Sequence, residues 1–218
     1  MRYLYREQII ARDFSRIIEC PMKYRMSSIP RSISWDEVER TLGTVDPRFP
    51  IGKRDFAILL LLITYGLRAR EVAALTLDDV DWRAEKLTVR TRKAGHSTVY
   101  PLATIVGKAL LDYLKQSRPK TEERRLFITE RAPRKPLSHG AVAMRAAYYL
   151  QKAGVEVPRP GSHTFRHSCA QRLVDSDFSL KVIGDYLGHR SISSTEIYSK
   201  ISVEALREVA LGYGEEIL

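Results

Sequence analysis

The sequence has few cysteines and no long apolar run, and both shortages exclude whole classes of protein. Its 218 residues include two cysteines, Cys20 and Cys169, which offer neither a disulfide framework nor the ligand spacing of a metal site. The longest apolar run covers residues 56–63, which is far too short to span a bilayer, and the N-terminus lacks the apolar core of a signal peptide. We therefore expect a cytoplasmic protein without a membrane partner, in which Cys169 has a packing role.

Acidic residues are also outnumbered, because 36 lysines and arginines stand against 26 aspartates and glutamates. The formal net charge is +10 and the sequence pI is about 9.7. Such an excess favours a polyanionic partner, since each phosphate that a basic side chain neutralises releases counterions and adds affinity. Charge alone is equally compatible with a basic protein that binds no nucleic acid, so the partner has to be argued from motifs.

Most of the chain shows helical patterns, interrupted by one short stretch of alternating residues. Ser34 and Glu37 form a capping-box signature at the start of a helix. Further helices are expected at residues 3–18, 55–64, 71–75, 104–116, 138–152, 164–175, 179–186, 193–198 and 203–210. Strands are expected near 86–91 and 97–102, with another at 126–129. The predicted fold class is therefore mainly α with a small antiparallel β-sheet (α+β). Residues 1–30 are expected to form a separate N-terminal helix and linker, and residues 31–218 are expected to form the main domain.

Three motifs in the last quarter of the chain hold residue types that suit attack on a phosphodiester. His163 and Arg166 lie in the segment His-Thr-Phe-Arg-His, His189 follows Leu-Gly, and Tyr198 comes nine residues later. Arginine can clamp two phosphate oxygens, histidine can hold or move a proton, and a tyrosine oxygen can become a nucleophile. Because His163 and Arg166 are three residues apart on an expected helix, their side chains should point to the same side.

Two further cations lie upstream of these motifs. Arg68 stands at the junction of two expected helices, in Gly-Leu-Arg-Ala-Arg-Glu, a segment that ends at Glu71. Lys93 falls in or beside the turn between the two expected strands, where Lys86 and Arg92 are alternatives to it. An arginine here can neutralise a phosphate, and a lysine can donate a proton to a leaving oxygen once its site lowers its pKa.

Taken in order, these residues resemble the catalytic set of the tyrosine recombinases, also called phage integrases. The resemblance rests on Gly-Leu-Arg-x-x-Glu, on His-x-x-Arg-His, and on Leu-Gly-His followed nine residues later by Tyr, and it covers roughly residues 31–210. It implies that two arginines neutralise the phosphate, two histidines handle a proton and a nonbridging oxygen, a lysine protonates the departing 5′ oxygen, and a tyrosine attacks. The implied catalytic residues are Arg68, Lys93, His163, Arg166, His189 and Tyr198, with Glu71 as an orienting residue.

The chain departs from the family pattern close to the lysine. Ala94 stands where the family usually has glycine, and Tyr100 stands where it usually has valine, directly before Pro101 and Leu102. The spacing from Lys93 to this Pro-Leu pair matches the family.

The resemblance implies a site-specific recombinase or integrase that cleaves and rejoins double-stranded DNA through a 3′-phosphotyrosyl intermediate, without metal, cofactor or ATP. A homotetramer is expected only in the synaptic complex, and a monomer or weak dimer without DNA. Residues 1–30 resemble the end of the core-binding domain that precedes the catalytic domain in this family. The alternative is therefore a truncated, non-catalytic DNA-binding accessory or regulatory module. An RNA-binding protein is compatible with the charge, but the sequence has no aromatic-rich RNA-recognition strand motif.

Overall fold

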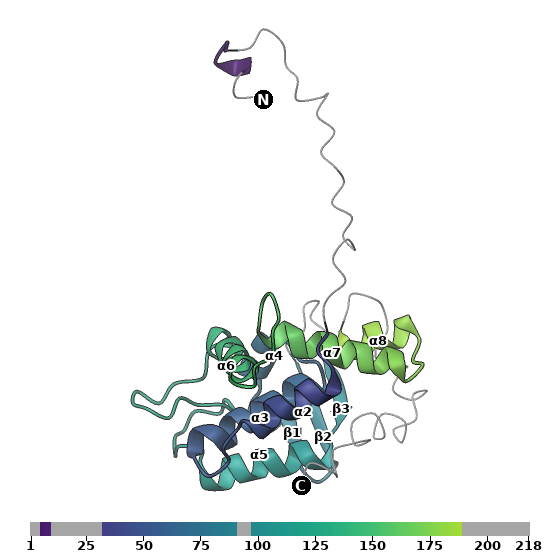
Figure 1. Cartoon of the computed structure of the whole chain (residues 1–218). Coiled ribbons are helices and arrows are strands. Elements are labelled where there is room, and N and C mark those ends of the chain that lie inside the picture. Colours follow the sequence, from purple (N-terminus) through teal and green to yellow (C-terminus); the bar gives the residue numbers. More distant parts are fainter. Residues whose placement is uncertain (1–4, 10–31, 91–96, 189–218) are drawn as a thin grey trace. The chain divides into compact units, whose positions relative to one another are not determined.

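The computed structural model describes residues 5–9, 32–90 and 97–188 (Figure 1). The chain divides into two compact units, Met1–Pro30 and Arg31–Leu218. Most of the expected helix at 3–18 and both expected helices beyond residue 189 lie outside the described residues. Among the helices that the structure describes, none is long and apolar enough to cross a membrane.

The second unit is mainly helical, with one small antiparallel sheet (Figure 1). Its described helices are α2 (Trp35–Gly43), α3 (Pro50–Thr64), α4 (Ala69–Ala74), α5 (Thr104–Gln116), α6 (His139–Lys152), α7 (Ser162–Asp175) and α8 (Leu180–Leu187), with a 3-10 turn at Leu77–Asp79. The strands β1 (Val80–Asp81), β2 (Lys86–Val89) and β3 (Thr98–Pro101) pair in the order β1-β2-β3. This architecture confirms the predicted fold class.

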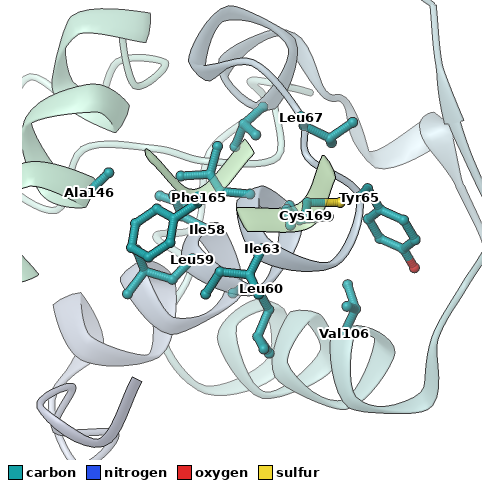
Figure 2. Packing of buried hydrophobic residues seen from close by; sticks show 14 of the residues in the cluster. Ile58, Leu59, Leu60, Ile63, Tyr65, Leu67, Val106, Ala146, Phe165 and Cys169 are labelled. Atoms are coloured by element: carbon teal, nitrogen blue, oxygen red, sulfur yellow. The ribbon is translucent and has the colours of Figure 1, made fainter. Parts of the chain in front are cut away.

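Helix α3 lies at the centre of the core and packs against α5 and α7. Figure 2 shows its apolar side chains, among them Ile58 and Leu59, gathered with Phe165 of α7. Each fully buried aliphatic or aromatic side chain contributes about 1.5–3 kcal/mol relative to an exposed one. The helix begins five residues earlier than predicted, because Pro50 occupies its first turn, where the missing N–H costs nothing.

One buried carboxylate ties α3 to α6. Asp55 is fully buried, and its Oδ1 accepts hydrogen bonds from Arg54 Nε and Nη2 at 3.0 and 2.9 Å. Its Oδ2 accepts from Arg145 Nε at 2.6 Å and from the Tyr149 hydroxyl at 3.2 Å. Two guanidinium groups therefore compensate one buried charge, which is the condition for such a charge to be tolerated inside a protein.

Two features of the sheet region differ from the sequence prediction. The predicted strand at 126–129 is wrong, because this part of the described chain forms only isolated bridges, Thr76 with Arg125 and Ile128 with Pro136. The short strand β1 was not predicted. A strand of two residues leaves almost no periodic signal in the sequence. The chain turns from β1 into β2 after Asp81, whose Oδ1 accepts hydrogen bonds from the backbone N–H groups of Arg83 and Ala84.

Candidate catalytic site

The turn that leads to Arg68 is shaped by Gly66. This glycine has φ +57°, in the left-handed region that disfavours other residues. A Cβ atom here would lie 2.6 Å from Leu187 Cδ2 and 3.2 Å from Cys169 Sγ, so the chain passes close to α7 and α8. Cys169 is buried, and burial raises the pKa of its thiol to about 12. The thiol therefore stays protonated and packs, as predicted.

Arg68 begins α4 as its N-cap residue and is held by Glu71 one turn later. The fully buried Glu71 carboxylate accepts from Arg68 Nη1 through Oε1 and from the Arg68 backbone N–H through Oε2, both at 2.8 Å. The Arg68 side chain is 20% exposed. Glu71 thus makes the contact expected of an orienting residue, while part of the guanidinium still faces solvent.

Arg166 lies on α7 and is buried to 5% exposure. Its Nη1 donates to the Gly66 carbonyl and its Nη2 to the Leu187 carbonyl, both at 2.6 Å. Arg68 Nη2 lies 3.5 Å from the next carbonyl along the chain, that of Gly188. The structure therefore brings the two predicted arginines together at the C-terminal end of α8, although they are 98 positions apart in the sequence.

The end of α8 offers a row of carbonyl groups to side chains from other elements. The last carbonyls of a helix have no partner within the helix, and they carry the negative end of its dipole. The Tyr186 carbonyl accepts from the Tyr100 hydroxyl of β3, and the two following carbonyls, of Leu187 and Gly188, accept from the two arginines. Gly188 ends the helix with φ 67°. His189 is the next residue in the sequence.

The two histidines of the His-x-x-Arg-His motif lie on successive turns of α7. His163 is exposed in the first turn, three residues before Arg166. His167 is half-buried, and burial lowers its pKa, with the nearby His163 and Arg166 lowering it further. His167 is therefore mainly neutral at neutral pH, while His163 is exposed to solvent.

Three of the predicted catalytic residues, Lys93, His189 and Tyr198, lie outside the described residues. Lys93 falls in the sequence between β2 and β3. The alternative Lys86 is exposed on β2, and Arg92 lies outside the described residues as well. The roles of these residues stay predictions.

Sequence reasoning missed the part that Tyr100 and Tyr186 play at this site. Their only signal was that Tyr100 departs from the family pattern; a hydrogen bond from a side chain to a distant backbone carbonyl has no sequence signature.

Comparison with known proteins decides the family. The sequence profile of the phage integrase family matches residues 31–204. The chain belongs to this family. It is 41% identical to y4gC of Sinorhizobium fredii, a protein named as an integrase/recombinase, over 84% of this chain and 95% of that protein. It is 39% identical to y4rA of the same organism, also named as an integrase/recombinase, over 95% of this chain and 50% of that protein. The chain thus spans only about half the length of some relatives.

Solved structures share the fold. A crystal structure of XerA recombinase matches with a TM-score of 0.65 and 25% identity, over 92% of this chain and 70% of that one. A structure of the site-specific recombinase XerH bound to its difH substrate matches with a TM-score of 0.63 and 18% identity, over 81% of this chain and 52% of that one. The helical unit with its small sheet is therefore a fold that tyrosine recombinases use.

Proposed function

We propose that this protein is a site-specific DNA recombinase or integrase that cleaves and rejoins double-stranded DNA through a covalent tyrosine link. The observation that carries the proposal is the meeting of Arg68 and Arg166 at the end of α8, directly before His189 in the sequence. Family membership, the net charge of +10, and the DNA-bound XerH structure with the same fold support a DNA substrate.

In the proposed cleavage step, the phenol oxygen of Tyr198 attacks phosphorus and His163 assists removal of the phenol proton. A phenol has a pKa near 10, so nearby cations have to favour its ionised form. The bond from phosphorus to the 5′ oxygen breaks, and Lys93 gives that oxygen a proton. The products are a 3′-phosphotyrosyl ester and a free 5′ hydroxyl.

Rejoining is the reverse reaction with a 5′ hydroxyl from the partner strand. The ester conserves the energy of the phosphodiester bond, so the proposed cycle uses neither ATP nor a metal. Arg68, Arg166 and His189 would stabilise the charge on the nonbridging oxygens, which a preorganised set of donors does most effectively. Four protomers would assemble only on paired DNA sites.

A nicked suicide substrate tests the proposal, because loss of the cut strand traps the covalent adduct. The wild-type protein should form an adduct that denaturing electrophoresis detects. Tyr198→Phe should bind DNA as well as the wild type and form none. Tyr148→Phe is the matched control, since Tyr148 is an exposed tyrosine on α6 and its adduct should form normally.

The leaving-group role of Lys93 has its own test. Lys93→Ala should slow cleavage about 10²- to 10⁴-fold, the usual contribution of a general acid. A substrate with a 5′-bridging sulfur should restore the rate, because sulfur leaves without protonation. If Lys86→Ala, and not Lys93→Ala, shows this pattern, the general acid is on β2.

The alternative is a non-catalytic DNA-binding module, and the same assay separates the two. The alternative draws on the fact that the chain spans about half the length of some relatives. Specific DNA binding without any trapped adduct from the wild-type protein would favour it.

A further inference from the structure

We propose that Tyr100 is a positioning residue for DNA cleavage, acting through its hydrogen bond to the last turn of α8. This inference rests on the proposed function, because it concerns how the cleavage site is held. It concerns a position at which the family resemblance described above implies valine.

The first observation is the place of the Tyr100 side chain. Tyr100 lies on β3, pairs with Leu87 of β2, and is fully buried. Its hydroxyl donates to the Tyr186 carbonyl, 86 positions along the chain. Its ring lies between two others, with centroids 5.0 Å from Tyr65 and 5.1 Å from Tyr186. The hydroxyl therefore joins β3 to α8 inside a packed aromatic cluster.

The second observation is that the other two tyrosine hydroxyls make equally specific backbone contacts. Tyr186 donates to the carbonyl of Thr64, the last residue of α3, at 2.9 Å. Tyr65 donates to the Pro101 carbonyl and accepts from the Ala103 N–H, both at 2.9 Å. The cluster thus connects the end of α3, the end of β3 and the last turn of α8.

The third observation is which carbonyl Tyr100 binds. The Tyr186 carbonyl is the first of three in a row, and the next two bind Arg166 and Arg68. A shift of this helix end would move the acceptors of both arginines together. Replacing Tyr100 with phenylalanine removes the hydrogen bond to the Tyr186 carbonyl but leaves the β2–β3 pairing and the Tyr65 contacts with Pro101 and Ala103. The loss should therefore act on the phosphate-binding side of the site and not on the lysine between β2 and β3.

The test uses Tyr100→Phe, which keeps the ring and removes only the hydroxyl. Adduct formation on the suicide substrate, at saturating DNA, should slow about fivefold, which corresponds to about 1 kcal/mol and to one ordinary hydrogen bond. DNA affinity should stay within about twofold, because the substrate contacts are retained. Tyr100→4-aminophenylalanine, which returns a donor to the same position, should recover part of the rate.

Tyr113→Phe is the matched structural control. Tyr113 is a buried tyrosine on α5, stacked on Phe127, and its hydroxyl accepts from the Ile128 N–H at 3.2 Å. Its replacement should lower the melting temperature about as much as Tyr100→Phe and leave cleavage at the wild-type rate. Equal slowing by the two variants would reduce Tyr100 to a packing residue and overturn the proposal.

The 5′-bridging sulfur substrate decides the route by which Tyr100 acts. In a Lys93→Ala background on this substrate, Tyr100→Phe should still slow cleavage about fivefold, because the leaving group no longer needs a proton. Disappearance of the effect would show that Tyr100 acts through the lysine, against the proposal. If the wild-type protein forms no adduct at all, the proposed function fails and this inference fails with it. A wild-type adduct with an unaltered Tyr100→Phe rate overturns this inference alone.

Discussion

Replacing Gly66 with alanine should destabilise the protein more than the same change at Gly154 or Gly43, for two separable reasons. The left-handed backbone at Gly66 costs a residue with a Cβ atom about 1–2 kcal/mol. The new methyl would also lie 2.6 Å from Leu187 Cδ2, and Leu187 is 2% exposed and has little room to move. Overpacking of this kind costs about 1–3 kcal/mol. The sum is about 2–5 kcal/mol, or a fall in Tm of about 4–20 °C for a unit of this size.

Two other glycines separate these contributions. Gly154 has φ +67° but nothing within 4 Å of a new Cβ, so Gly154→Ala should show the backbone cost alone, about 1–2 kcal/mol. Gly43, the last residue of α2, has open space and no positive φ. Gly43→Ala should therefore be neutral or stabilising by up to about 1 kcal/mol, since alanine is the better helix former.

Thermal and urea denaturation of the three variants measure the differences. Because the Gly66 carbonyl accepts from Arg166, Gly66→Ala should also slow adduct formation, whereas Gly154→Ala should not. Adding Leu187→Ala removes the atom that the new methyl meets, so the double variant should lose less stability than the sum of the single losses. Strict additivity, or a Gly66→Ala loss no larger than that of Gly154→Ala, would refute the close approach as the cause.

Two further predictions concern ionisable side chains that are wholly or partly buried, His167 and Asp55. Burial lowers the pKa of His167 below its ordinary 6.5, so the unfolded chain binds a proton at this residue more readily than the folded chain does. The free energy of unfolding should therefore fall as the pH drops below about 6.5, and it should level off once the pH is below the pKa of the folded state. His167→Gln should therefore lose less Tm than the wild type between about pH 7.5 and about pH 5.5; equal losses would contradict this. Asp55→Asn should lower the free energy of unfolding by about 3–5 kcal/mol, because Arg54 and Arg145 lose the negative charge that compensates them. A change below about 1 kcal/mol would show that the two arginines do not depend on the Asp55 charge.

Most of the fold was predictable because local signals agreed with tertiary packing. The capping box of Ser34 and Glu37 is present as predicted, and α5 has the predicted bounds. The start of α3 was misplaced although Pro50 marked it, because the apolar periodicity begins only later. The predicted strand at 126–129 failed because a run of only three apolar residues followed by a threonine is compatible with any buried segment. In the structure this segment forms isolated bridges.

The candidate site was only partly predictable, because the sequence shows which residue types are present but not which distant backbone groups they contact. The resemblance implied that Glu71 orients another residue of the site, and in the structure the Glu71 carboxylate contacts Arg68 one turn away. The meeting of Arg68 with Arg166 came from family resemblance and not from local physics. Arg166 donates to the carbonyls of Gly66 and Leu187, and Arg68 donates to the Gly188 carbonyl besides Glu71. Backbone carbonyls are acceptors that any residue at those positions would supply.

Neutral carbonyl acceptors and charged carboxylate acceptors affect the charge of an arginine differently. A carboxylate partner neutralises a guanidinium, as Glu71 does in part for Arg68, whereas the carbonyls of Gly66 and Leu187 orient Arg166 without cancelling its charge. Donors that are fixed before the substrate arrives need no reorganisation when charge develops on the phosphate, and this preorganisation is the largest single source of rate enhancement in many enzymes. The close turn at Gly66 and the end of α8 therefore serve the same purpose. They supply neutral acceptors at fixed positions, which would hold the Arg166 guanidinium in place in the proposed reaction.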